Sequence, residues 1–215
     1  MVEVVYDPND DGWDVVYVPS QSIEPEEIAK LVGFVHYEVG DVLDAWEGVN
    51  SVQERPLLSC LLRLSLCEAS RCVYVSSVEI PDQAMVYYLS VCTGESAVRE
   101  SILSRLLLLH MGDDSPLALT EKLNRHPEMI ARIRSWIRPA SAFLRCIIST
   151  PYEENLSRLL EIPLRANPPS YSYLGTKHGS RTIFQEAGIR KALPKHHFLL
   201  LLTSISLPKG MWTGL

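Results

Sequence analysis

Residues 71–94 read RCVYVSSVEIPDQAMVYYLSVCTG, and this stretch decides the fold class. Its first half is a β-branched run that predicts a buried strand, and the pair Ile80-Pro81 predicts a turn after it. Its second half runs from Asp82, a plausible helix cap, to Gly94, a stop signal, and therefore predicts a helix. A short strand followed closely by a helix is the repeating unit of parallel α/β folds.

The same alternation continues on both sides of this stretch. Ile130, Ile133 and Ile137 form an apolar stripe with helical spacing, and Pro151 suits the first turn of a helix. Short strands that are apolar throughout are typically buried on both faces, so the chain is expected to form a Rossmann-like, mainly parallel sheet with flanking helices. Strands are expected at 13–20, 71–81, 105–114, 141–150 and, briefly, 162–168, and helices at 22–33, 82–94, 115–137 and 151–162.

Two segments do not follow this order. Residues 39–55 interrupt what would otherwise be one long helix ending at 57–66, because Gly40, Gly48 and Pro56 disfavour helical backbone. The tail 191–215 carries an apolar run with no partner element after it. Both segments are expected to be either a real alternative product or retained non-coding sequence.

Composition narrows the class of protein. The 215 residues carry a net charge of −6, which suits one ordinary domain and argues against a general nucleic-acid-binding role. The five cysteines show no CxxC spacing and follow no signal peptide, so we expect reduced thiols in a cytoplasmic protein. The apolar run near the C-terminus spans about eleven residues where a bilayer requires about twenty, so no membrane partner is expected.

Common catalytic motifs do not occur in the sequence. It contains neither glycine-rich phosphate loop, no H-E-x-x-H pair and no G-x-S-x-G elbow. Asp113 and Asp114 in the run GDDS could hold Mg²⁺, but such a run is more often a turn, so no metal site and no catalytic residue are assigned. The ends of the expected strands are rich in Ser, Thr, Asp and Asn, which fits a ligand crevice and, equally well, ordinary turns.

The stretch YLGTKHGSRTIFQEAGI, residues 173–189, is the most informative for function. It predicts a loop, a helix that begins near Thr176, and a stop at Ala187-Gly188. Lys177 and Arg181 lie one helical turn apart near the amino end of this helix, where backbone N–H groups and a lysine suit a phosphate. A surface helix with solvated charges explains the same spacing, and spacing alone favours that simpler interpretation.

The order of four segments resembles one ATP-grasp group, which includes the IQ-motif-containing protein H of animals and bacterial peptide-ligase-like ATP-grasp proteins. The segments read IEPEEIAKLVGFVHYE, RCVYVSSVEIPDQAMVYYLS, DDSPLALTEKLNRHPEMIARIR and YLGTKHGSRTIFQEAGI. Members of the group are similar in a V-Y-V-T-S strand, a Y-Y-L helix, an L-T-E-K helix and the entry motif S-K-x-G-S-R-x-x-F-x-x-A-G-V. The resemblance covers roughly residues 14 to 190.

This resemblance implies an ATP-dependent ligase that uses Mg²⁺ to form an acyl-phosphate. It implies a pre-ATP-grasp domain at 1–172, the entry helix of a truncated ATP-grasp domain at 173–190, and an atypical tail at 191–215. Lys177 would contact ATP phosphates; Arg181 and Ser180 are weaker cofactor-binding candidates, since arginine can instead pin the helix and Ser180 and Thr176 can instead be caps. The Mg²⁺ ligands of the family fall after the Ala-Gly pair and are not found here, so the chain alone is expected to be inactive. The alternative is a non-catalytic module that binds a protein partner.

Overall fold

A computed structural model describes residues 12–20, 56–115, 117–175 and 177–189. The chain divides into two compact units, residues 1–169 and residues 170–215. The expected helix at 22–33, the interruption at 39–55, the cap at Thr176 and the tail at 191–215 lie outside the described residues.

The first unit is built on a parallel sheet of four strands. These are β1 (Asp14–Val18), β2 (Cys72–Ser76), β3 (Leu106–His110) and β4 (Ala142–Cys146), in the spatial order β3-β2-β1-β4. Every neighbouring pair is parallel, with Val16 aligned to Val73 on one side and to Leu144 on the other. The expected α/β fold with a mainly parallel sheet and flanking helices is confirmed.

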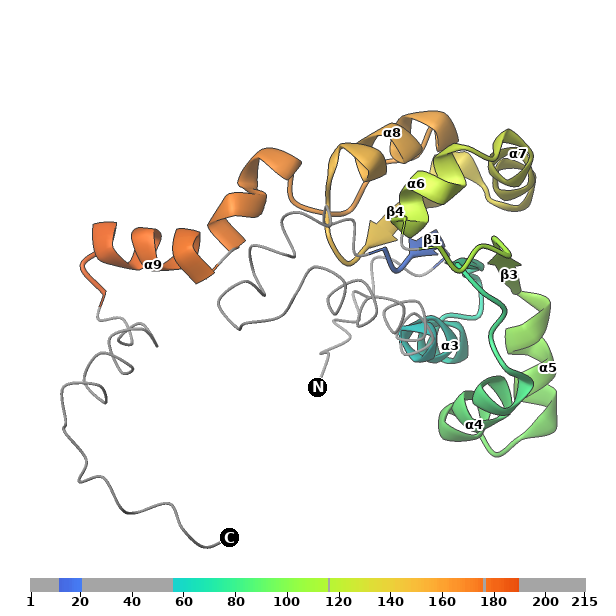
Figure 1. Cartoon of the computed structure of the whole chain (residues 1–215). Helices are drawn as coiled ribbons and strands as arrows, with labels where there is room; N and C mark the ends of the chain where they lie inside the picture. Colours follow the sequence, from blue (N-terminus) through green and yellow to red (C-terminus); the bar gives the residue numbers. More distant parts are fainter. Residues whose placement is uncertain (1–11, 21–55, 116, 176, 190–215) are drawn as a thin grey trace, which may run out of the picture. The chain divides into compact units, whose positions relative to one another are not determined.

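Helices cover both faces of this sheet (Figure 1). On one face lie α3 (Leu57–Leu66), α4 (Asp82–Cys92) and α5 (Ser96–Ser104); on the other lie α6 (Leu119–Asn124), α7 (Pro127–Trp136) and α8 (Pro151–Leu160). Alternate strand residues feed two separate apolar cores, because successive side chains point to opposite faces. Val16 and Leu144 belong to the core under α6, α7 and α8, whereas Tyr74 and Phe143 belong to the core over α3.

Several details of the sequence predictions are wrong. The fifth strand expected at 162–168 is a single bridge between Leu144 and Leu164, because Pro163 has no N–H and only one residue meets β4. The helical stretch expected at 115–137 is two helices, α6 and α7, which are separated ahead of Pro127. Asp82 is the first residue of α4 and makes no capping hydrogen bond. The expected stripe of Ile130, Ile133 and Ile137 is buried, as predicted.

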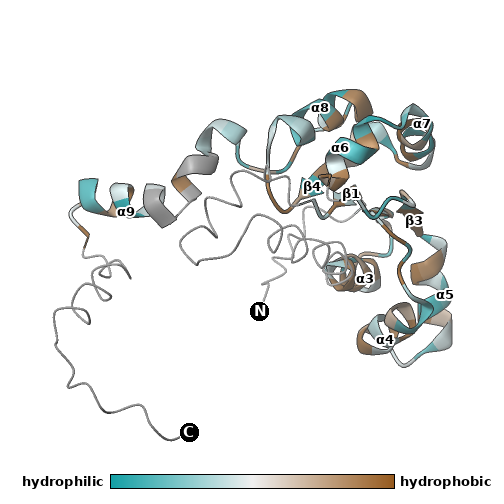
Figure 2. Cartoon of the chain, in the orientation of Figure 1, coloured by the Kyte–Doolittle hydropathy of each residue, from teal (hydrophilic) through white to brown (hydrophobic). Residues whose placement is uncertain are grey.

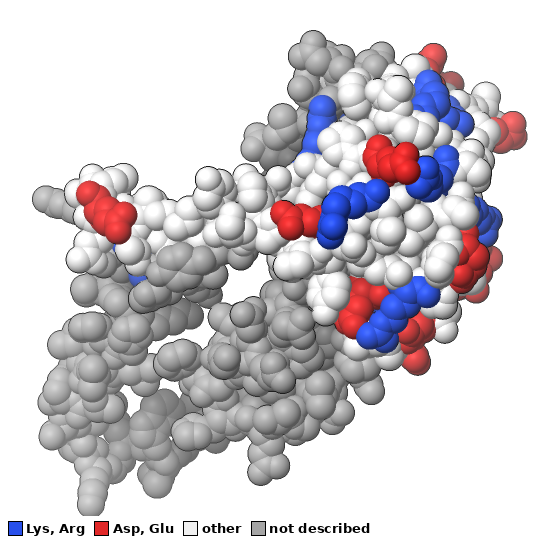
Figure 3. Space-filling model, turned by 90° about the horizontal axis from the view of Figure 1, so that it is seen from above, with Lys and Arg blue, Asp and Glu red and all other residues white. Residues whose placement is uncertain are grey.

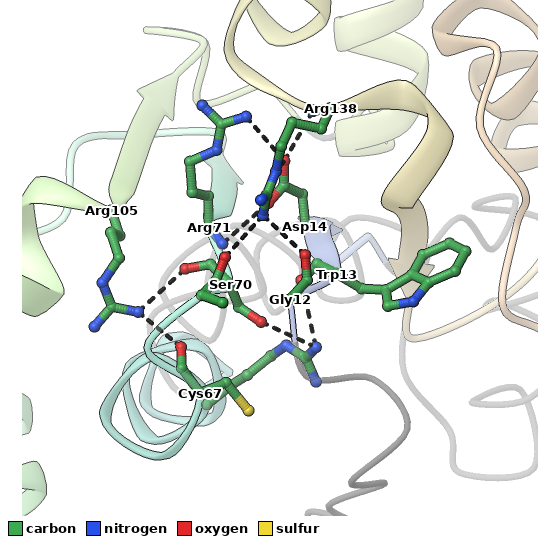
Figure 4. A network of polar contacts seen from close by, with 10 residues as sticks. Gly12, Trp13, Asp14, Cys67, Ser70, Arg71, Arg105 and Arg138 are labelled. Atoms are coloured by element: carbon green, nitrogen blue, oxygen red, sulfur yellow. Dashed lines mark hydrogen bonds and ion pairs between the residues drawn. The ribbon is translucent and has the colours of Figure 1, made fainter.

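A network of arginines closes the amino end of the sheet (Figure 4). The Asp14 carboxylate, at the start of β1, accepts hydrogen bonds from the backbone N–H and side chain of Arg71 and of Arg138, at 2.6–3.2 Å. Burial alone would raise the pKa of Asp14, but the hydrogen bonds and charges of Arg138 and Arg71 hold it below its usual value. Beside this network, Arg105 donates to the carbonyls of Leu64, Cys67 and Ser70 and so satisfies the end of α3.

Helix α8 has well-defined ends. Thr150 and Glu153 form a capping box at its start, with Pro151 in the first turn as expected. Its end is less favourable, because Glu161 adopts a left-handed backbone with φ 57°. The N–H of Glu161 donates to the Arg158 carbonyl and that of Ile162 to the Ser157 carbonyl, a helix-ending pattern that usually employs glycine.

We therefore expect Glu161→Gly to be more stable than Glu161→Ala by about 1 kcal/mol, because only glycine enters this conformation without a Cβ penalty. Both substitutions remove the same exposed ion pair with Arg134, so their difference isolates the backbone effect. Urea unfolding of the two variants measures it. Equal midpoints would show that the left-handed residue carries no strain.

A 3-10 turn, η3 (Pro169–Gly175), begins at the last residue of the first unit and runs into the second, whose described part also contains the helix α9 (Lys177–Glu186). After α9, the Gly188 N–H donates to the Gln185 carbonyl and the Ile189 N–H donates to the Phe184 carbonyl. Gly188 has φ 67°, so this is a Schellman ending in which glycine supplies the left-handed residue. The spacing of Phe184, Gly188 and Ile189 in the sequence thus has a structural reason.

Candidate functional site

The sheet has a topological switch point, and the residues at the carboxyl ends of its strands surround it. β1 lies between β2 and β4. The chain moves across the sheet from β1 to β2 and β3 and then returns past β1 to β4, so the direction of the connections changes between β1 and β4. Ligands of open parallel sheets bind in the crevice at such a point. The residues that follow the strands here include Ser20 after β1, Ser77 after β2 and Ser149 after β4. Ser20 accepts a hydrogen bond from the Thr120 N–H, which ties β1 to α6.

A buried lysine occupies the β2–β3 side of this end. Lys122 of α6 is 1% exposed, and its Nζ donates to the carbonyls of Asp113 and Ser115 at 2.8 and 2.7 Å and to Ser77 Oγ at 3.2 Å. Burial lowers the pKa of Lys122, whereas the charges of Asp113 and Asp114 act in the opposite direction. Three donors directed at three oxygens identify a structural tie between the strand ends.

The GDDS run, considered above as a magnesium candidate, is the turn that this lysine holds. The Asp113 carboxylate accepts a hydrogen bond from the Ser115 N–H at 2.8 Å and lies 3.8 Å from Lys122 Nζ. Hydrogen bonding to Ser115 lowers the pKa of Asp113. Among the described residues no cluster of three metal-ligating side chains is found.

On the other side of the switch point, polar side chains lie between α6 and the start of α8. Asn124 donates to the Tyr152 carbonyl, and Glu153 accepts from Thr150. Burial, aided by the charge of Glu153, raises the pKa of the Cys146 thiol to about 12, which disfavours the thiolate form.

The face of the sheet toward α3 carries cations at β4. Arg145 is half-buried, aligned with Tyr17 of β1, and its guanidinium carbon lies 5.6 Å from the Tyr17 ring centre. Arg165 is exposed and lies 4.1 Å above the ring of Phe143, which is on the same face of β4. Burial raises the pKa of Tyr17 to about 12, so the ring beside Arg145 is neutral. The arrangement places positive charge and aromatic surface next to the switch point.

The residues predicted from the sequence to bind nucleotide all lie on α9, in the second unit. Lys177 is the first residue of the helix, as expected. Arg181 follows one turn later and is half-buried. Ser180 lies inside the helix and therefore does not cap it. The structure thus places the three residues within two turns of one helix.

Three charged residues near the ends of the sheet strands were not picked out as candidates from the sequence. Asp14, Lys122 and Arg145 are charged residues within apolar or amphipathic runs, and each is half or fully buried. A charge at a position that the strand or helix pattern assigns to the interior was the available signal, because such charges require a partner.

Comparison with family models, curated proteins and solved structures finds no match to this chain. Within the described part of the chain no helix has the length and apolar character needed to cross a membrane. The described fold is that of an α/β protein with a four-stranded parallel sheet, and its second unit contains the helix α9, which carries Lys177 and Arg181.

Proposed function

We propose that this chain is the amino-terminal part of an ATP-grasp ligase-like protein. The α/β unit would be the pre-ATP-grasp domain, and α9 would be the entry helix of the nucleotide-binding module. The observation that carries the proposal is α9 itself, which begins at Lys177 and ends through Gly188 with a Schellman motif. Lys177 and Gly188 are among the residues that this sequence has in common with the entry motif of the resembled group.

The chemistry of this proposal depends on the amino end of α9. A helix start presents unbonded N–H groups and a partial positive charge, which favour phosphate, and Lys177 adds a full charge there. Arg181 and Ser180 would reinforce this site from the next turn. In the parent reaction ATP and Mg²⁺ activate a carboxylate for attack by an amine. No Mg²⁺ ligands are assigned in this sequence, so we propose nucleotide binding by this chain and no turnover by the chain alone.

Calorimetric titration of the full chain with ATP and Mg²⁺ tests the proposal. We expect binding in the millimolar range or tighter, and Lys177→Ala should weaken it by about 1–3 kcal/mol, as loss of a charge-assisted contact does. Arg132→Ala is the matched control, because Arg132 is an exposed cation on α7 in the other unit. An equal loss of binding in both variants would indicate only a general charge effect and would remove Lys177 from the site.

A second candidate function is a module that binds a protein partner. It is favoured by α4, where Val86 and Tyr87 are each 64% exposed and Val91 is 51% exposed. Figure 2 shows hydrophobic residues along this helix. Contiguous exposed apolar residues on a helix commonly mark a contact surface. A stoichiometric partner that is lost with Tyr87→Ser, together with no heat from ATP, would favour this function over the first.

A further inference from the structure

We propose that Arg145 forms a binding site for a small oxyanion at the switch point between β1 and β4. The site belongs to the sheet unit, whereas the proposed nucleotide contact belongs to α9. The oxyanion site therefore goes beyond the proposed function, and each of the two proposals can be tested without the other.

The first argument is charge balance. The basic residues Arg71, Lys122, Arg125, Arg134 and Arg138 each lie beside a carboxylate. Figure 3 likewise shows basic and acidic groups close together on the visible face. Arg145 has no such pair: across the described ranges no carboxylate forms an ion pair with it, and the aromatic ring of Tyr17 lies beside its guanidinium. A half-buried guanidinium without a counter-charge is unfavourable, and a bound anion would offset that cost.

The second argument is position. Arg145 is the fourth residue of β4 and is aligned with Tyr17, one residue before β1 ends, so it lies at the carboxyl end of the sheet. β1 and β4 are the two strands that flank the change in winding direction, where open parallel sheets bind ligands. The site is therefore where this class of fold places ligands, on the face that carries α3.

The third argument is geometry. The guanidinium group is planar and presents a rigid fork of donors that matches a carboxylate or a phosphate in a bidentate manner. The Tyr17 ring centre lies 5.6 Å from the guanidinium carbon and limits the orientation of the guanidinium group without neutralising its charge. Arg165 adds a second guanidinium over Phe143 on the same face of β4 and strengthens the local positive potential. Carboxylate and phosphate have this oxyanion chemistry in common, and the structure fits either.

The experiment follows the Arg145 side chain itself by NMR in the full-length chain. Its Nε–H resonance is assigned by its loss in Arg145→Gln, and the protein is titrated separately with inorganic phosphate and with succinate. We expect the resonance to shift saturably with at least one probe, and Arg145→Gln to weaken binding about tenfold or more. Saturation with phosphate alone identifies a phosphoryl ligand, and saturation with succinate alone identifies a carboxylate.

Three controls keep the outcome decisive. Arg132→Gln removes an equal charge from α7 and should leave the affinity within about twofold. Arg145→Lys retains the charge but loses the bidentate fork, so an intermediate affinity is expected even if the glutamine variant folds poorly. Lys177→Ala should not change the anion affinity, which separates this site from the proposed nucleotide contact. No shift with either probe, or equal affinity in wild type and Arg145→Gln, would overturn the proposal.

Discussion

Replacement of Asp14 by asparagine is expected to lower the free energy of unfolding by about 2–4 kcal/mol. The substitution retains the shape of the side chain, but its NH₂ group faces other donors where the carboxylate had a second acceptor oxygen. One of the two backbone N–H groups, of Arg71 or of Arg138, therefore loses its acceptor. The two arginine side chains are 32% and 45% exposed and can regain water, so the expected loss lies toward the lower part of the range for buried ion pairs.

The pH dependence of this effect has a defined sign. Because the folded state lowers the pKa of Asp14, its contribution is present above the unfolded value of about 3.9 and is lost as the pH falls through the folded pKa. Denaturant unfolding of wild type and Asp14→Asn at pH 7 and at progressively more acidic pH measures the difference. Glu100→Gln, an exposed site on α5, is the control and should change stability by less than about 0.5 kcal/mol. A pH-independent difference would show that packing and not charge explains the loss.

Lys122→Met is expected to cost about 2–3 kcal/mol in guanidinium unfolding, the second-largest effect. Methionine fills a similar volume, so the change removes the ammonium and leaves two carbonyls and the Ser77 hydroxyl without its donors. Relief of the desolvation cost of the buried ammonium opposes this loss, but three charge-assisted hydrogen bonds outweigh it. The turn at Asp113 should also loosen, with faster amide exchange at Ser115.

Arg125→Met is the matched control, because Arg125 pairs with Glu121 at the surface only, and we expect a change below about 1 kcal/mol. If Lys122→Met were neutral or stabilising, the desolvation cost of the buried ammonium would equal or exceed the stabilisation from its hydrogen bonds. The lysine would then be retained for a reason other than stability.

The strands could be predicted from the sequence because they are short, apolar and bounded by turn residues. All four lie within the expected ranges, and VVYV and CVYVS are buried on both faces as the absence of polar alternation implies. The helix α5 was not predicted, because it follows α4 after three residues and only Val98 and Ile102 of its residues belong to the apolar core. The order of the strands could not be predicted either, because no local sequence pattern indicates that β4 pairs with β1.

The sequence predicted where some candidate residues lie in the secondary structure, and it missed others. Lys177 at the start of a helix followed from spacing and from the Ala-Gly ending, which are local signals. The ties made by Asp14 and Lys122 depend on contacts between residues far apart in the chain, such as Asp14 with Arg138 and Lys122 with Ser77. Long-range pairing of this kind is determined by the sheet, and so it became visible only once the strands were placed.

The pairing of β1 with β4 has a consequence for the synthesis of the protein. Asp14 is aligned with Ala142, so β1, the first of the four described strands to leave the ribosome, gains its second neighbour only from β4, the last of the four. Until residue 146 has emerged, one edge of β1 has no partner from β4, and loop closure over this separation is slow compared with local helix formation. Completion of the sheet therefore awaits nearly the whole of the first unit.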